Sequence, residues 1–248
     1  MPTTMRLHRA LARAGLASRR RAELLIGEGR VRVNGAIAHI GQGIDPSADL
    51  VEIDGRRVNV HTVPTTWIVL HKPAGIMTTR SDPQGRRTVF ELVHDVPGLV
   101  YVGRLDLETE GVLLLTTDGD AANRLTHPRS GIERVYVATV TGDARAAADR
   151  ARRGVMLTDG LVLPKRVTVR QAPGGKWLFE VVIAEGRKRE VRRLCRELDL
   201  RVERLVRTAF GPVSLGNMPA GTTRALTGKE RGALAKLIGR SPDASDGS

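Results

Sequence analysis

Three carboxylates stand close together in one short stretch of the chain. Asp106, Glu108 and Glu110 lie within the segment VGRLDLETEGVLLLTTDGD (102–120). Like charges at this spacing repel one another unless cations or solvent intervene. The apolar run VLLLTT (112–117), typical of a buried strand, follows them directly. A charged loop in this position can present an ionised carboxylate to a substrate, and a solvated charged turn is the alternative interpretation.

The stretch AEGRKREVRRLCREL (184–198) has the apolar spacing of a helix. Positions i, i+3, i+4 and i+7 form one core-facing stripe: Val191, Leu194, Cys195 and Leu198. Cys195 is the single cysteine of the chain, and its place in the stripe predicts core packing rather than nucleophilic chemistry. A single cysteine also excludes an internal disulfide and a zinc site built on paired cysteines.

Arginines occupy the other faces of this predicted helix. At about 100° per residue, Arg192 lies on the flank of the stripe, whereas Arg189 and Arg193 point toward solvent. A half-buried arginine needs an acidic partner. The pattern therefore predicts a carboxylate partner for Arg192 and a solvated basic face for the other two.

Motifs for metal, nucleotide and nicotinamide chemistry are absent from the sequence. It contains no HExxH, no GxxxxGK[ST] and no GxGxxG after a predicted strand. The histidines are scattered, with no two at metal-ligand spacing on a predicted helix. The acidic pair in DGD (118–120) could bind magnesium, but capping of the following helix explains it better. We therefore expect no metal and no cofactor.

The charge balance indicates a polyanionic partner. Forty Lys and Arg against 27 Asp and Glu give a net charge of +13, and a polyphosphate chain suits such a field. The charge alone does not identify the partner, which could also be anionic lipid or DNA. It could equally reflect an organism whose proteins are rich in arginine. Aromatic residues make up only 3%, which argues against a sheet that stacks several bases. Neither a membrane-spanning run nor a signal-peptide core is present, so we expect a cytoplasmic protein without membrane contact.

Residues 1–62 are predicted to form a small basic module. Two helices are expected, the first ended by Gly15 and the second capped by Ser18. Strand-like runs with turns follow at 31–35 and 51–55. The first turn of the second helix carries three cations, which the helix dipole disfavours: Arg19, Arg20 and Arg21. A phosphate partner would compensate them, and an ordinary solvated cluster is the alternative.

The remainder of the chain predicts a second domain. We place a linker at 63–66, a domain at 67–240 and a disordered tail at 241–248. Strands are expected from Trp67 and at 112–117, 134–142 and 177–186, and Thr227 with Glu230 forms a capping box for a last helix. Residues 78–90 are expected to form an exposed loop whose arginines are solvated or grip RNA: Arg80, Arg86 and Arg87. Strands outnumber helices, so we predict an α+β fold with a mixed, largely antiparallel sheet and flanking helices.

Two resemblances to known families follow from these motifs. The segment RLHRALARAGLASRRRAELLIGEGRVRVNG (6–35) resembles the alpha-L RNA-binding domain, in which the second helix and its arginines lie on RNA phosphates. The segment 102–120 strongly resembles the catalytic signature of the RsuA family of pseudouridine synthases. HKPAG (71–75), LTHPRSGIERVYVATV (125–140) and EGRKREVRRLC (185–195) extend that resemblance in the order of the family.

The second resemblance implies roles for individual residues. Asp106 matches the family's essential aspartate, Tyr136 the tyrosine that stacks on the target base, and Arg192 the basic residue that pairs with the aspartate. Arg104 is expected to orient the loop or the flipped nucleotide, and Leu194 to line the pocket.

Other residues are expected to bind RNA or depart from the family pattern. Arg86 and Lys188 join the arginines of the second helix as expected substrate-binding residues. Glu108 stands where Asp or Asn is expected. Glu190 stands where related sequences often have Gln, but it projects away from Arg192 on the helix, so we do not expect the two to pair.

The implied reaction is the isomerisation of a uridine to pseudouridine in RNA. It needs no cofactor, one ionised carboxylate and a base taken out of its stack. An arginine beside the carboxylate would keep it ionised under bound RNA. Ribosomal RNA or a pre-ribosomal particle is the expected partner, the large-subunit RNA is favoured over the small, and the protein is expected to be a monomer. The alternatives are a non-catalytic RNA-binding or ribosome-assembly protein and a DNA-binding structural protein.

Overall fold

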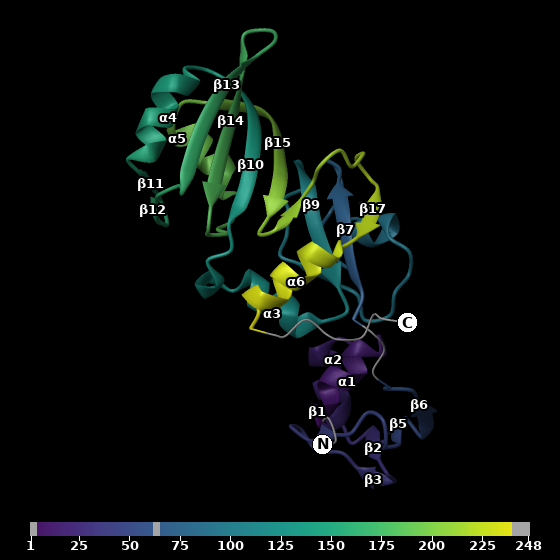
Figure 1. The fold of residues 1–248 in the computed structure, drawn as a ribbon. Helices are drawn as coiled ribbons and strands as arrows, with labels where there is room; N and C mark the ends of the chain where they lie inside the picture. The colour runs from purple at the N-terminus through teal and green to yellow at the C-terminus, as the bar shows by residue number, and fades with distance from the viewer. Residues whose placement is uncertain (1–3, 62–64, 240–248) are drawn as a thin grey trace. The chain divides into compact units, whose positions relative to one another are not determined.

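The computed structural model describes residues 4–61 and 65–239 and divides into two compact units. The first unit contains the described N-terminal residues up to Thr66, together with 95–100 and 116–119. The second begins at Trp67 and contains the rest of the described chain. The residues between 61 and 65 and the predicted tail at 241–248 lie outside the described residues. Figure 1 shows the order of the elements along the chain.

The first unit contains two helices and a set of short strands. Their bounds are α1 Leu7–Arg13, α2 Arg19–Gly27, β1 Met5–Arg6, β2 Val31–Val33, β3 Ala36–Ile37, β4 Gly43–Ile44, β5 Val51–Ile53 and β6 Arg56–Val58. The strands pair antiparallel in the order β3-β2-β5-β6, with β1 on β4. The core between helices and strands includes Leu7, Leu11, Leu25 and Val31.

The predicted helix boundaries of this unit are confirmed. The Ser18 side chain accepts a hydrogen bond from the backbone N–H of Arg21, which caps α2 at its N-terminus. Gly15 follows α1 with φ +74°. A Cβ there would lie 2.8 Å from the backbone nitrogen of Gly98. The glycine therefore allows segment 95–100 to lie against the end of α1.

The second unit is built on one mixed sheet. Its nine strands are β7 Trp67–Lys72, β8 Val100–Val102, β9 Thr109–Thr116, β10 Arg134–Thr141, β13 Arg166–Ala172, β14 Lys176–Ile183, β15 Arg201–Phe210, β16 Val213–Ser214 and β17 Thr223–Ala225. The main order is β13-β14-β10-β15-β9-β7-β17, with β16 on β15 and β8 on β9. The pairs around β10, β13 and β14 are antiparallel, whereas β15 and β9 run parallel. The expected α+β fold with a mixed, largely antiparallel sheet is confirmed.

Helices and a separate hairpin complete this unit. They are α3 Gly119–Thr126, α4 Ala144–Arg152, α5 Glu190–Glu197, α6 Gly228–Leu237, the 3-10 turns η1 Val89–Leu92 and η2 Pro128–Ser130, and the hairpin of β11 Val155–Leu157 with β12 Gly160–Val162. The predicted capping box between Thr227 and Glu230 is present at the start of α6. The predicted helix after Asp118 begins at Gly119.

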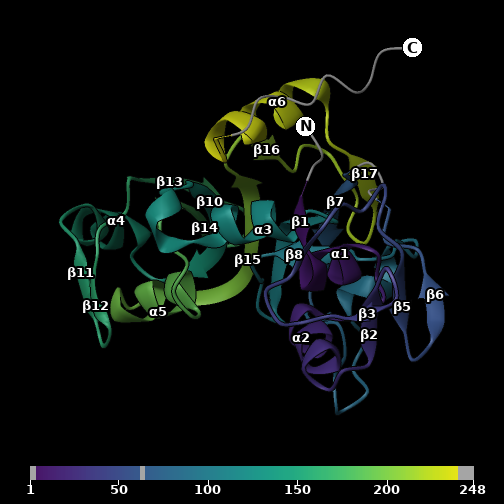
Figure 2. The same ribbon diagram turned by 90° about the horizontal axis from the view of Figure 1, so that it is seen from below.

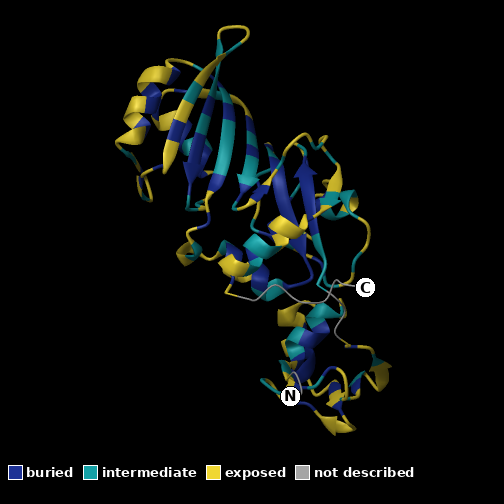
Figure 3. Ribbon diagram, in the orientation of Figure 1, coloured by how far each residue is buried: buried dark blue, intermediate teal, exposed yellow. Residues whose placement is uncertain are grey.

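Two hydrophobic cores lie on the sheet. Alanines of α4 and the apolar stripe of α5 pack against β10, β14 and β15 (Figures 1 and 2). A second core joins β7 and β9 to α3 and α6. Figure 3 shows that residues of β7 and β9 are buried along most of their length. The loops next to β7 and β9 are therefore attached to strands that are buried in the core.

The prediction of an exposed loop at 78–90 is wrong at both ends. Thr78, Thr88 and Val89 are buried, whereas 83–87 are exposed as expected. Thr78 is buried because its hydroxyl reaches the backbone of the loop that carries Asp106, and Thr88 caps the η1 turn. The polar composition of the segment indicates exposure and does not show that its threonines form internal hydrogen bonds.

Candidate active site

A cavity of about 300 Å³ opens in the second unit, between the loop before β9, strands β10 and β15, and the start of α5. Five of the predicted site residues line it: Arg104, Asp106, Tyr136, Lys188 and Arg192. They come from three distant parts of the sequence. The fold therefore brings together the carboxylate, the aromatic ring and the basic residues that the sequence indicated.

The loop that carries Asp106 is clamped by hydrogen bonds on both sides of that residue. The Thr78 hydroxyl donates to the backbone carbonyl of Leu105 at 2.9 Å. The Lys72 Nζ donates to the carbonyls of Leu107 at 3.1 Å and Thr109 at 2.9 Å. Asp106 itself is half-buried. These contacts fix the backbone on either side of the carboxylate, which is what a pre-organised catalytic group needs.

Lys72 is a fully buried lysine at the end of β7. Its Nζ also donates to the carbonyl of Pro73 at 2.9 Å, so the ammonium group is surrounded by backbone oxygens. Burial lowers its pKa to about 8, against the opposing effect of the Glu108, Asp106 and Glu110 carboxylates.

Tyr136 lies on β10, half-buried at the cavity wall. It faces Arg207 across the antiparallel β10–β15 pair. Tyr101, the other tyrosine of the chain, instead packs near Phe90, with ring centroids 6.3 Å apart. The tyrosine available to a ligand of this cavity is therefore Tyr136.

The expected ion pair between Arg192 and Asp106 is not formed. Arg192 donates from Nη2 to the backbone carbonyl of Glu108 at 2.8 Å. Within the described chain, no nitrogen of Arg192 lies within 4.0 Å of a carboxylate oxygen. The helix face of Arg192 was predictable, but the loop oxygen opposite it was not. A turn closed from the Thr109 N–H to the Asp106 carbonyl presents a backbone oxygen there.

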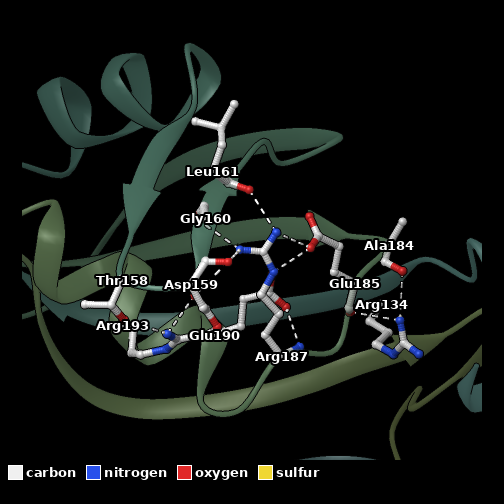
Figure 4. A network of polar contacts seen from close by, with 10 residues as sticks. All are labelled: Arg134, Thr158, Asp159, Gly160, Leu161, Ala184, Glu185, Arg187, Glu190 and Arg193. Carbon is white, nitrogen blue, oxygen red and sulfur yellow. Dashed lines mark hydrogen bonds and ion pairs between the residues drawn. The ribbon is translucent and has the colours of Figure 1, made fainter. Parts of the chain in front are cut away.

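Figure 4 shows how the start of α5 is fixed. Arg187 donates to the backbone carbonyls of Gly160 and Leu161 in the β11–β12 hairpin and to the Glu185 carboxylate. The Glu190 carboxylate accepts from the Arg187 backbone N–H at 3.1 Å. This network links the hairpin to the helix that carries Arg192.

The prediction that Arg193 points into solvent is wrong. Its side chain is only 20% exposed and makes a two-pronged ion pair with Asp159, at 2.9 and 2.8 Å. The turn of the β11–β12 hairpin supplies this acid, and nothing local in the sequence of α5 indicates it. Arg189 is exposed as expected.

Glu190 does not hydrogen-bond Arg192, in agreement with the sequence-based expectation. It is 3% exposed and lines the cavity. Burial raises its pKa, while the Arg187 backbone N–H opposes that change.

Several other expected site residues lie outside the cavity. Leu194 is fully buried in the core between α5 and the sheet, so it does not line the pocket, because it belongs to the apolar stripe. Arg86 pairs with Asp82 through two hydrogen bonds in the exposed part of the 78–90 loop. The three arginines at the start of α2 are exposed on the first unit: Arg19, Arg20 and Arg21.

The sequence did not predict that three cations around the cavity and its loop are buried: Lys72, Arg134 and Arg207. Arg134 donates from Nη1 to the carbonyls of Ile132, Ala184 and Glu185, and burial lowers its pKa. Every residue of β7 from Ile68 to Lys72 is buried, so no alternation of buried and exposed positions marks the lysine in the sequence.

Gly111 explains how the backbone of Arg207 approaches β9. The two residues are register partners in the parallel β9–β15 pair. Gly111 has φ +113°, and a Cβ there would lie 2.1 Å from the Arg207 carbonyl oxygen. A side chain at this position would displace β15 and the cavity wall.

Other chemistries receive no support from the described residues. Across 4–61 and 65–239, no group of three or more His, Cys, Asp or Glu is arranged to hold a metal ion. Cys195 is buried in the core as predicted, and burial raises its thiol pKa to about 12. None of the described helices is both long and apolar enough to cross a membrane.

Comparison with known proteins identifies the family to which this chain belongs. The family model for RNA pseudouridylate synthase matches residues 66–197, and the model for the S4 domain matches residues 5–50. The chain therefore belongs to the RNA pseudouridylate synthase family, and its activity is that of an isomerase. The resemblance to RsuA-type synthases with an N-terminal RNA-binding module is confirmed.

Relatives cover nearly the whole chain. An uncharacterized RNA pseudouridine synthase of Aquifex aeolicus is 40% identical over 239 residues, covering 95% of each chain. Ribosomal large subunit pseudouridine synthase B of Vibrio vulnificus is 41% identical over 245 residues, covering 96% of this chain and 77% of that protein. A crystal structure of a pseudouridylate synthase aligns with a TM-score of 0.61 at 26% identity, covering 93% of this chain and 99% of the other.

Proposed function

We propose that this synthase isomerises a specific uridine of ribosomal RNA, with the large-subunit RNA favoured. The observation that carries the proposal is the cavity that Asp106 and Tyr136 line together with Arg192 of α5 and the basic residues just before that helix. The name of the Vibrio vulnificus relative supports the large-subunit choice. The small-subunit RNA is the second candidate.

In the proposed mechanism the target uridine leaves its stack and enters the cavity. Unstacking costs a few kcal/mol, and stacking on Tyr136 returns roughly 1–3 kcal/mol. The Asp106 carboxylate acts on the sugar, as nucleophile or as base. Arg192 and Lys72 hold the backbone of its loop in place through the carbonyls described above.

A basic groove beside α5 supports RNA binding next to the cavity. It has a volume of about 630 Å³. Its lining includes Asp159, which pairs with Arg193, and the cations Lys188, Arg189, Arg192, Arg193 and Arg196. Its first three cations also line the catalytic cavity. A strand whose uridine occupies the cavity would find this row of cations beside it, and each phosphate neutralised releases counterions. Arg104 adds a further cation to the lining of the catalytic cavity.

The proposed organisation is an RNA-binding domain at 1–62, a linker at 63–66 and a catalytic domain at 67–240. The exposed arginines of α2 bind RNA phosphates, and Arg86 gives a further contact from the 78–90 loop. The protein is a cytoplasmic monomer that requires no cofactor.

Pseudouridine mapping tests the proposal. Ribosomal RNA from cells that lack this protein is incubated with the purified full chain, and pseudouridines are located by carbodiimide labelling and primer extension. One new pseudouridine in the large-subunit RNA is the expected result. A new site only in the small-subunit RNA would contradict the choice of subunit. Binding without any new pseudouridine in either RNA would favour the rival function, a non-catalytic ribosome-assembly protein.

A further inference from the structure

Arg207 lies at the cavity wall, 2% exposed, with an incomplete set of hydrogen bonds. Its Nε donates to the carbonyl of Val112 at 2.8 Å. Its Nη2 is buried and has no hydrogen-bond partner. Among the described residues no carboxylate lies within 4.0 Å of this guanidinium. A buried cation without an acidic partner destabilises a fold, so its place at the cavity wall points to a ligand with which it interacts.

The surroundings of Arg207 favour negative charge on that ligand. A second guanidinium, that of Arg134, lies 5.2 Å from the Phe210 ring centroid, and the Arg207 Cζ lies 5.1 Å from the same ring. The nearby acid Glu190 is buried, and burial raises its pKa, which disfavours the ionised form. This part of the cavity thus holds two buried cations and one acid whose ionised form is disfavoured by burial, and charges interact more strongly when they are buried than when they are exposed to water.

The register of the sheet places Arg207 beside the proposed stacking residue. Tyr136 and Arg207 are partners in the antiparallel β10–β15 pair, and both line the cavity. Directly opposed residues have Cβ atoms roughly 5 Å apart. A uracil ring stacked on Tyr136 therefore presents its edge to the guanidinium.

We propose that Arg207 is a catalytic residue that donates a hydrogen bond from Nη2 to a carbonyl oxygen of the target uracil and stabilises the uracil anion. This assignment rests on the proposed function of the cavity. When the N1–C1′ bond breaks, its electron pair remains on the ring and spreads over N1 and the carbonyl oxygens. The C5–C1′ bond then forms with a ring electron pair, the C5 proton leaves and N1 gains a proton, so no atom is gained or lost.

The negative charge on the uracil ring, which Arg207 stabilises, develops only once the glycosidic bond begins to break. A donor that acts on such a charge accelerates the chemical step and adds little to substrate binding. This separates the assignment from a purely structural role, in which loss of the guanidinium would lower the melting temperature and leave the chemistry of folded molecules unchanged.

Arg207→Met tests the assignment, because methionine fills much of the same volume without a charge. The matched control is Arg204→Met on the same strand, where the arginine is exposed and pairs with Glu110. Single-turnover rates and dissociation constants are measured with an RNA that carries uridine and with the same RNA carrying 5-fluorouridine at the target. Consumption of the target nucleoside is followed in nuclease digests by mass spectrometry.

Arg207→Met is expected to lower the rate on uridine about 100-fold, with less than about a threefold change in RNA affinity. The loss on 5-fluorouridine is expected to be several-fold smaller, because fluorine withdraws electrons and itself stabilises the anion. An unchanged rate, an equal loss on both nucleosides, or a loss confined to affinity would overturn the assignment.

A second variant, Arg207→Lys, and the parent protein distinguish failure of the Arg207 assignment from failure of the proposed function. If Arg207→Met does not fold, Arg207→Lys takes its place in the same comparison of the two nucleosides. A parent chain that isomerises no uridine in any ribosomal RNA would overturn the proposed function itself. A parent that isomerises while the Arg207 variants match it would overturn only the role of Arg207.

Discussion

Replacing Lys72 by methionine should remove a specific pH dependence of stability. Burial lowers the pKa of the Lys72 ammonium from 10.5 to about 8, and each pKa unit corresponds to about 1.4 kcal/mol. The full difference is therefore worth about 3.5 kcal/mol. Because the folded pKa is the lower one, the unfolded chain binds more protons between about pH 8 and pH 10.5. Stability from this group must then rise with pH in that window and stay flat below it.

The assay is urea unfolding of the parent and of Lys72→Met from about pH 7 to pH 10. The free energy of unfolding of the parent, relative to the variant, should rise by roughly 2.5 kcal/mol across this range. Lys236→Met, which changes an exposed lysine of α6, serves as the control and should track the parent. A parent-minus-variant difference that stays flat, or falls with rising pH, would refute the assignment of a destabilised buried ammonium.

Two further predictions concern the base and the RNA backbone. Tyr136→Leu should lower the single-turnover rate roughly tenfold to a hundredfold by loss of stacking, and a parental rate would count against the stacking role. Neutralising Arg20 and Arg21 together to glutamine should weaken RNA binding and reduce the slope of log affinity against log salt by about 1.5. The paired change of Arg56 and Arg57, exposed on β6, should alter that slope less; equal effects would mean that α2 has no special role.

Much of the fold was predictable because local rules and tertiary packing agree. Ser18 caps α2, and the Thr227–Glu230 box starts α6, as the sequence indicates. The stripe that includes Cys195 faces the core. Asp106 and Tyr136 were found through a family signature, and the structure adds that they share one cavity.

The unpredicted part of the site depends on contacts between distant segments. Lysine and arginine are rarely fully buried, so Lys72 and Arg207 were assigned no role. Their burial follows from the register of strands far apart in sequence, which Gly111 makes possible at β15. The predicted partner of Arg192 was wrong for the same reason. Its actual partner is a backbone carbonyl, which no sequence pattern indicates.

The most direct test of the central claim is the activity of Asp106→Asn on the mapped ribosomal RNA. Asparagine preserves the shape of the side chain and removes its negative charge. Asp149→Asn, at an exposed aspartate of α4 whose side chain pairs with Arg152, is the matched control. We expect Asp106→Asn to form no pseudouridine while it binds the RNA with near-parental affinity, and the control to remain active. Pseudouridine formation by Asp106→Asn at the parental rate would contradict the account.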